Sequence, residues 1–407
     1  MRSKAILVVI CVALVGVTVY AVNAVQGGSG QSHANQAEIG ASKAVSTLAF
    51  TPPAGDAVVG AMVGTPSHGG TWLFDESQSS ATLIYVAPPN IEKTRITLGV
   101  PSQIGLLYST RAYMTRSPTG AIWIAANNSI VKVVPSSDQV TVMDVPNPPS
   151  NSTAEAHFPP TIQGQHHIVG IAASQTTVMI VLTGTTAVVD LSVLNGTFRQ
   201  LSLPANDSPV SVALSGTIWA VGLVVWSGAT ANGPGTGSTD AIDVIGKTHA
   251  SHVVAGNSLG LSAVQNGFAS IGTTSSLTRI KASAANSSVD VSETAGTIEA
   301  SSGAARPVTI GQLLPIPGSP TDVIAMTESG FLKIDLANGT VLSTIGLPVV
   351  ANSGTERPPP APGESPSASA STTMQERPLF ASVDGGGNVW FEANLTHTIY
   401  EVSGIAT

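Results

Sequence analysis

Cysteine is almost absent from this 407-residue sequence, because Cys11 is the single cysteine and it lies in the first hydrophobic stretch. A disulfide scaffold, a thiolate zinc site and a cysteine nucleophile are therefore excluded from the rest of the chain. A chain of this length can bury a substantial core without disulfides or metal ions, so the shortage of cysteine does not argue against export.

Charged residues are also scarce, at 10% of the chain against about 25% in typical soluble domains. Ser, Thr, Asn, Gln and Gly must therefore cover much of the surface. The formal net charge is −8 at pH 7, and no basic run alternates with aromatic residues. Such a surface repels a polyanion, so we expect no nucleic-acid partner.

Helical periodicity is missing after residue 41, as are a P-loop, an HExxH motif and a DxDxDG calcium loop. Val, Ile and Thr dominate the apolar segments instead, and these residues favour strands. We therefore expect an all-β body.

The N-terminus begins with a short basic segment and continues into mostly apolar residues over 5–22. Small residues at 22–24 suit signal peptidase, so residues 1–24 are predicted to be a signal peptide or an uncleaved membrane anchor. The two alternatives stay open, because an 18-residue helix spans about 27 Å, close to the thickness of a bilayer core. In both cases the protein is secreted or membrane-anchored with its body outside the cytoplasmic membrane. Residues 25–43, rich in Gly, Ser, Gln and Asn, are predicted to be a flexible spacer.

A short turn followed by a strand with a large apolar residue recurs along residues 44–407. Five units carry an aromatic residue in this position and two carry Met or Ile. Successive anchor residues lie 40 to 66 positions apart, and spacings of about 40 to 50 are typical of propeller blades. The seven anchor residues are Trp72, Trp123, Met179, Trp219, Phe268, Ile324 and Trp390.

Each unit contains four short apolar segments separated by turn residues. In residues 159–204 these segments are 167–174, 176–183, 185–192 and 197–204. Such spacing favours successive antiparallel hairpins. The sequence therefore predicts an all-β, seven-bladed β-propeller preceded by an N-terminal hydrophobic helix, and the weak third and sixth anchors leave six or eight blades open.

The two ends of the repeat region complement each other. The last unit stops after three strands, and residues 44–52 form a single predicted strand before the first full unit. We expect that strand to complete the last blade, which removes two exposed sheet edges. Residues 227–240 and 353–373, rich in Gly, Ser, Thr or Pro, are predicted to be loop insertions.

Two segments, GAIWIAANNSIVKVV at 120–134 and GNVWFEANLTHTIYEV at 387–402, resemble the streptogramin lyase-like propellers and their relatives with NHL-type repeats. The resemblance implies a propeller fold, which supports many different functions. In the lyase, His and Glu residues surround a magnesium ion near the central axis. The third strands of this chain depart from the family pattern, and those ligands have no motif-level match here.

Four residues are candidates for a binding site at the mouth of the channel. His166 and His167 precede the predicted innermost strand of the third unit, and Glu392 and His397 lie in the last unit. Adjacent residues on a strand point to opposite faces, so at most one of the two neighbouring histidines faces the axis. The anchor aromatics are predicted to pack between blades rather than bind carbohydrate, because aromatic side chains usually serve cores.

These features favour a monomeric, non-enzymatic binding scaffold without a cofactor or metal site. Its partner would be an extracytoplasmic protein or a small molecule, and an uncleaved N-terminal segment would add contact with the membrane. The alternative is a streptogramin lyase-like, metal-dependent lyase or hydrolase, which would hold Mg²⁺ or Ca²⁺ at the central channel.

Overall fold

The computed structural model describes the chain between residues 58 and 403. The N-terminal segment, the spacer and the predicted closing strand at 44–52 lie outside the described residues. Among the residues that are described, no helix has the length and hydrophobicity needed to cross a membrane. The gaps within the described range are 66–68, 78, 90, 101–111, 127, 151–165, 204–206, 228–236, 246–250, 256–259, 265–266, 272–275, 286–287, 298–309, 329, 348, 352–372, 376 and 395–397.

The first three sheets of the structure each have four antiparallel strands. Sheet 1 contains β1 (Val58–Gly64), β2 (Thr71–Glu76), β3 (Ala81–Ala87) and β4 (Ile91–Gly99). Sheet 2 contains β5 (Tyr113–Arg116), β6 (Ile122–Ala126), β7 (Ser129–Val134) and β8 (Gln139–Asp144). Sheet 3 contains β9 (Ile168–Ala173), β10 (Thr177–Leu182), β11 (Ala187–Ser192) and β12 (Phe198–Ser202).

The next three sheets repeat this order. Sheet 4 contains β13 (Asp207–Ser215), β14 (Ile218–Ser227), β15 (Gly237–Ile245) and β16 (Ser251–Ala255). Sheet 5 contains β17 (Ser262–Val264), β18 (Gly267–Ile271), β19 (Ser276–Ala285) and β20 (Ser288–Thr297). Sheet 6 contains β21 (Ile310–Pro315), β22 (Asp322–Thr327), β23 (Gly330–Asp335) and β24 (Val341–Gly346).

The last sheet has three described strands, and a small hairpin precedes it. Sheet 7 contains β27 (Pro378–Val383), β28 (Val389–Ala393) and β29 (Ile399–Val402). The hairpin pairs β25 (Val349–Ala351) with β26 (Thr373–Gln375). Strands thus extend into both predicted insertions, since β14 ends at Ser227, β15 begins at Gly237 and β26 begins at Thr373.

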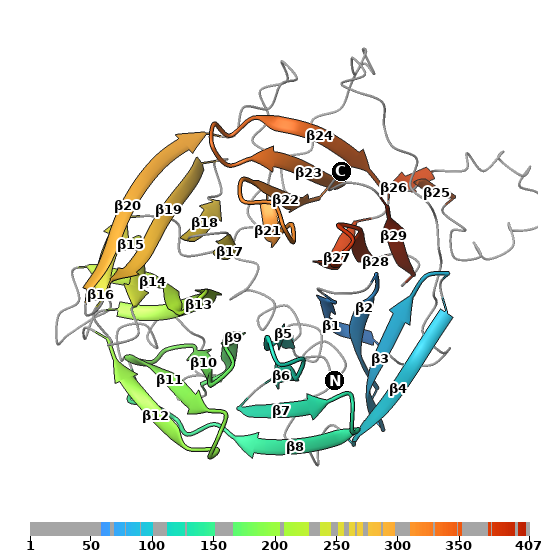
Figure 1. Ribbon diagram of the computed structural model, residues 1–407, viewed down its shortest axis with the longest axis horizontal. Coiled ribbons are helices and arrows are strands. Elements are labelled where there is room, and N and C mark those ends of the chain that lie inside the picture. Colours follow the sequence, from blue (N-terminus) through green and yellow to red (C-terminus); the bar gives the residue numbers. More distant parts are fainter. Residues whose placement is uncertain are drawn as a thin grey trace, which may run out of the picture.

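The seven sheets stand around a central axis with their first strands innermost (Figure 1). Each inner strand contacts the inner strand of the next sheet, and β27 contacts both β21 and β1, so the ring is closed. The prediction of an all-β, seven-bladed propeller is confirmed, and the six- and eight-bladed alternatives are wrong for the described chain. The proposed fourth strand of the last sheet, residues 44–52, stays a prediction.

The predicted anchor residues all lie on the second strand of their sheets, and each is at most 8% exposed. Trp123 packs in a cluster with Val178 and Ile180 of the third sheet. Trp390 packs with Leu73 and Ile84 of the first sheet. The anchors therefore join neighbouring blades, which agrees with the expectation of a packing role and leaves these rings little surface for carbohydrate.

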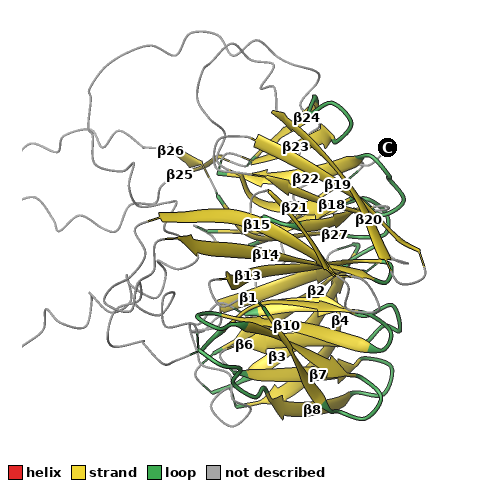
Figure 2. Cartoon of the chain, turned by 90° about the vertical axis from the view of Figure 1, so that its left-hand side faces the viewer, coloured by secondary structure: helices red, strands yellow, loops and turns green. Residues whose placement is uncertain are grey.

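The two faces of the ring carry different connections (Figure 2). Because the strands are antiparallel, the first and third turns of the six four-stranded sheets and the first turn of sheet 7 lie on one face, here called the short-turn face. The second turns and the links between sheets lie on the opposite face, here called the link face. The longest gaps in the described chain, 101–111, 151–165, 298–309 and 352–372, all begin and end on the link face.

The turn at residues 384–388, which joins β27 to β28, links the last sheet of the ring to the first through hydrogen bonds. The fully buried carboxylate of Asp384 accepts five hydrogen bonds. Its Oδ1 accepts from the backbone N–H groups of Gly386 (2.8 Å) and Asn388 (3.0 Å). Its Oδ2 accepts from Asn388 Nδ2 (3.1 Å), Trp390 Nε1 (2.9 Å) and the backbone of Gly70 (2.9 Å). The bond from Gly70 crosses from sheet 1 to sheet 7, between residues 314 positions apart.

Further contacts support the same junction. The backbone N–H of Gly385 donates to the carbonyl oxygen of Thr65, and the hydroxyls of Thr71 and Ser382 lie 2.9 Å apart. Gly64 of β1 approaches β27 so closely that a Cβ atom there would collide with the carbonyl oxygen of Val383. The junction of the first and last blades therefore depends on close backbone packing as well as on the buried carboxylate.

Candidate functional site

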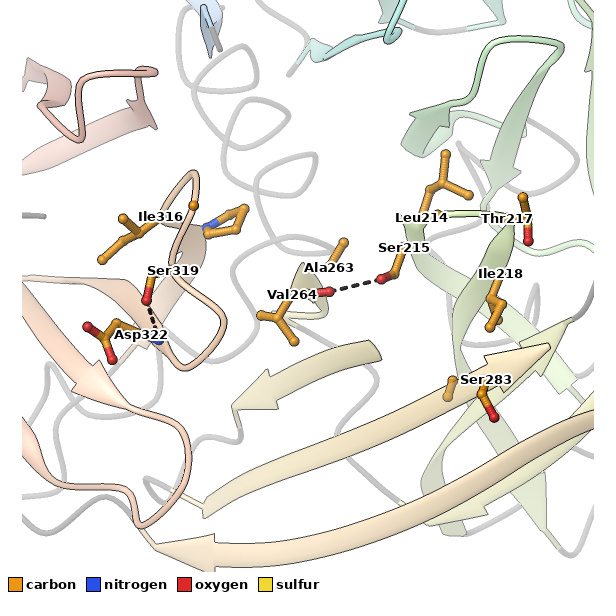
Figure 3. A pocket seen from close by; sticks show the side chains of 14 residues that line it. Leu214, Ser215, Thr217, Ile218, Ala263, Val264, Ser283, Ile316, Ser319 and Asp322 are labelled. Atoms are coloured by element: carbon orange, nitrogen blue, oxygen red, sulfur yellow. Dashed lines mark hydrogen bonds between the residues drawn. The ribbon is translucent and has the colours of Figure 1, made fainter. Parts of the chain in front are cut away.

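A recess of about 740 Å³ opens on the short-turn face where sheets 4, 5 and 6 meet (Figure 3). Most of its lining comes from the first hairpins of three consecutive blades, at residues 214–218, 263–264 and 315–322, and Ala282 and Ser283 of β19 complete it. Sheet 4 has a two-residue turn here, whereas residues 316–321 form a six-residue turn in sheet 6. The longer turn therefore supplies the wall on the side of sheet 6.

Hydroxyl groups hold the hairpins of this recess in place. Ser215 Oγ donates to the carbonyl oxygen of Val264 (2.9 Å) and accepts from the backbone N–H of Gly267 (3.2 Å), which ties sheet 4 to sheet 5. Ser319 Oγ accepts from the backbone N–H of Asp322 (3.0 Å). The recess is therefore formed before any ligand enters, which reduces the entropy cost of binding.

The one carboxylate that lines the recess is compensated by its neighbours. Thr321 Oγ1 donates to Asp322 Oδ1 (3.0 Å), and Lys333 Nζ lies 3.6 Å from Asp322 Oδ2. Ion pairing leaves this wall close to neutral, so the recess has no strong preference for a charged ligand.

The remaining surface combines aliphatic and hydroxyl side chains. Leu214 and Val264 are half-buried and line the recess, while the hydroxyls of Thr217 and Ser283 are exposed at its edge. Such a lining suits an uncharged ligand with an aliphatic group, because apolar area supplies affinity and a few polar groups set orientation.

The two predicted histidines immediately precede β9, the innermost strand of sheet 3, as the sequence predicts. His166 is only 5% exposed, and its ring contacts the Ser150 hydroxyl (3.1 Å) and the carbonyl oxygen of Thr183 (2.9 Å). His167 is half-buried, and burial, together with the nearby His166, lowers the pKa of its imidazole. His166 is therefore directed toward the second turn of its own sheet on the link face.

Glu392 has a different position from the one expected. It lies on β28, one strand outward from the innermost strand of sheet 7, and it is fully buried. The expectation that Glu392 lies at the channel mouth is corrected, because the alternation of β28 directs this side chain between blades, like Trp390 two residues earlier. His397 lies outside the described residues.

The structure therefore does not bring the described candidates together, since the histidines belong to sheet 3 and Glu392 to sheet 7. Within the described ranges, no group of three or more His, Cys, Asp or Glu residues could hold a metal ion. The recess has no signal in the sequence, because Ser, Thr, Gly and Pro in hairpin turns are ordinary turn residues. The Asp384 site does have a local sequence signal, because the DGGGNVW segment at 384–390 contains four of the five donors to its carboxylate.

Solved structures with a similar fold are propellers of low sequence identity. The β-propeller domain of Myceliophteria thermophila Cps50 (Swd1) has a TM-score of 0.57 and 8% identity, covering 88% of this chain and 99% of that chain. The Neurospora crassa Pan2 WD40 domain has a TM-score of 0.50 and 9% identity, with 89% and 95% covered.

A chain of the Mitotic Checkpoint Complex has a TM-score of 0.54 and 9% identity, with 92% of this chain and 99% of that chain covered. No protein-family model and no curated protein matches the sequence. At such identities the similarity shows the fold alone, and the streptogramin lyase and NHL resemblance is confirmed only as far as the propeller architecture.

Proposed function

We propose that this protein is a monomeric binding scaffold outside the cytoplasmic membrane, which holds a segment of a protein partner in the recess between sheets 4, 5 and 6. The observation that supports this proposal is a single recess between three consecutive sheets, which is lined by aliphatic and hydroxyl side chains. The similar structures support a role in assembly, since one of them is a chain of a protein complex.

The location rests on the N-terminal sequence. Basic residues precede the apolar stretch at 5–22, which favours export of everything that follows. A low content of charged residues and a net charge of −8 fit a partner other than a nucleic acid.

The ligand chemistry follows from the lining. Half-buried Leu214 and Val264 offer a site for one aliphatic side chain, and the hydroxyls of Thr217 and Ser283 can bond to the backbone of an extended peptide. Because Asp322 is paired with Lys333, the peptide needs no compensating charge. The proposal requires no cofactor.

Obstructing the recess with the substitution Thr217→Arg should weaken peptide binding. Peptides would be selected from a displayed random library against the full-length protein, and their affinities measured by calorimetry. Thr217 is exposed at the edge of the recess, so a larger side chain there blocks entry without disturbing the core. We expect a loss of about tenfold or more, equivalent to about 1.4 kcal/mol.

The matched control is Ser137→Arg, which adds the same side chain to an exposed turn of sheet 2 on the same face. Peptides that bind Thr217→Arg and the parent protein equally well would contradict the recess as the site. A melting temperature that rises with Mg²⁺ or Ca²⁺ would favour the metal-dependent alternative instead.

A further inference from the structure

A serine and a histidine form a close pair on the link face, away from the recess. Ser150 Oγ lies 3.1 Å from His166 Nε2, and His166 Nδ1 lies 2.9 Å from the carbonyl oxygen of Thr183. Ser150 is exposed, whereas the imidazole of His166 is only 5% exposed. An external molecule can therefore reach the serine residue, while its imidazole partner is shielded.

The contact with Thr183 determines which ring nitrogen carries the proton. A carbonyl oxygen only accepts hydrogen bonds, so His166 Nδ1 must be the protonated nitrogen. In the neutral imidazole, Nε2 is then the unprotonated nitrogen and accepts the hydrogen bond of the Ser150 hydroxyl. A nucleophile, a base and a group that orients the base are thus in the order required for activation of a serine.

The pair is held in place by the second turn of sheet 3. Ser150 forms an antiparallel bridge with Thr185, and the backbone N–H of Thr186 donates to the carbonyl oxygen of Pro149 (3.0 Å). On the other side, the backbone N–H of His167 donates to Thr183 Oγ1 (3.1 Å), and Thr183 N–H donates to the carbonyl oxygen of His167 (2.9 Å). Both partners are therefore fixed by the same four-residue turn, 183–186.

We propose that Ser150 is a nucleophilic serine that accepts the acyl group of a carboxylic ester, with His166 as its general base. Ser150 Oγ forms a bond to the ester carbonyl carbon while its proton passes to His166 Nε2. The bond from that carbon to the alkoxy oxygen then breaks, and Nε2 returns the proton to the departing alcohol. Attack by water, deprotonated by the same nitrogen, releases the carboxylic acid and restores the serine. The Thr183 carbonyl orients the imidazole but carries no negative charge, so turnover should be slow and acylation easier to detect than catalysis.

A fluorophosphonate probe tests this inference on the purified full-length protein. Its phosphorus forms a bond to the activated serine oxygen, fluoride leaves, and the hydroxyl proton passes to the imidazole. Peptide mapping by mass spectrometry would measure the labelling rate of each serine. General-base assistance should make Ser150 react about 100-fold faster than an unassisted serine. The internal reference is Ser137, an exposed turn serine whose hydroxyl donates to the carbonyl oxygen of Val134 (3.4 Å).

The variant His166→Asn removes the general base but keeps the hydrogen bond by which this side chain supports the fold. The asparagine amide can still donate to the Thr183 carbonyl from the position of Nδ1, but it has no atom at the position of Nε2. We expect labelling of Ser150 to fall to the rate of Ser137, and labelling at this position to vanish in Ser150→Ala. Equal rates at Ser150 and Ser137 in the parent protein would overturn the inference, and this comparison needs no variant to fold.

Discussion

Replacing Asp384 with alanine is expected to lower the free energy of unfolding by about 4 kcal/mol, because five hydrogen-bond donors lose one buried acceptor. An unsatisfied buried polar group costs about 1–3 kcal/mol, and partial relaxation keeps the total below the sum. Urea denaturation followed by tryptophan fluorescence measures the effect, since Trp390 is one of the donors.

The substitution Asp384→Asn should also destabilise the protein, although it preserves the shape of the side chain. Two donors face Oδ1 and three face Oδ2, so either orientation of the amide places its NH₂ group against at least two other donors.

The control is Asp335→Ala, at a turn where the carboxylate accepts from the backbone N–H of Ala337 (2.8 Å) at an exposed site. We expect a cost of about 1 kcal/mol there. If the Asp384→Ala variant lost no more stability than this control, the view that the buried carboxylate closes the ring would have to be abandoned.

The second large effect concerns Asp75, a carboxylate on β2 that is 4% exposed. Burial raises the pKa of this carboxyl group from 3.8 to about 6; Arg95 opposes the rise and Glu92 adds to it. Asp75 Oδ1 has no hydrogen-bond partner among the described residues. The charged form is therefore poorly compensated in the folded protein.

The pH dependence follows from the direction of this shift. Between about pH 4 and pH 6 the folded protein retains a proton on Asp75 that the unfolded chain releases. The stabilisation of the folded protein by protonated Asp75 is thus fully present below about pH 4 and is lost as the pH rises through 6. At about 1.4 kcal/mol per pKa unit, Asp75→Asn should stabilise the protein by about 1–3 kcal/mol at pH 8 and have little effect at pH 4.

Urea denaturation at both pH values would measure this difference. Asp138→Asn is the matched control, because it removes the same charge from an exposed turn and should be nearly neutral at either pH. If Asp75→Asn raised the free energy of unfolding equally at pH 4 and pH 8, desolvation of the Asp75 charge would not be the cause of the stabilisation.

The sequence predicted the seven sheets because the signals for them are local. Each unit repeats short apolar segments with turn residues between them, and its anchor is the second or third residue of the strand that follows the first turn. In the third unit the expected segment 176–183 corresponds to β10 at Thr177–Leu182. Burial of each anchor can also be predicted from its own unit, because a large apolar residue on a second strand has a neighbouring sheet to pack against.

The candidate sites could not be predicted in the same way. Glu392 is a buried residue of the second strand rather than a residue of the channel mouth, and a single strand contains no signal that separates these positions. The contact of Ser150 with His166 joins two residues on either side of a long link, and it depends on the turn of a third segment at 183–186.

Sequence alone determined the all-β class and the order of strands within each blade, because hairpins are encoded by neighbouring residues. It favoured seven blades, and the closed ring of seven sheets decided that number. Tertiary structure decided the recess between sheets 4, 5 and 6 and the junction between the first and last sheets. The physical reason is the ring itself, which places residues such as Gly70 and Asp384 within hydrogen-bonding distance only after every blade between them has folded and packed.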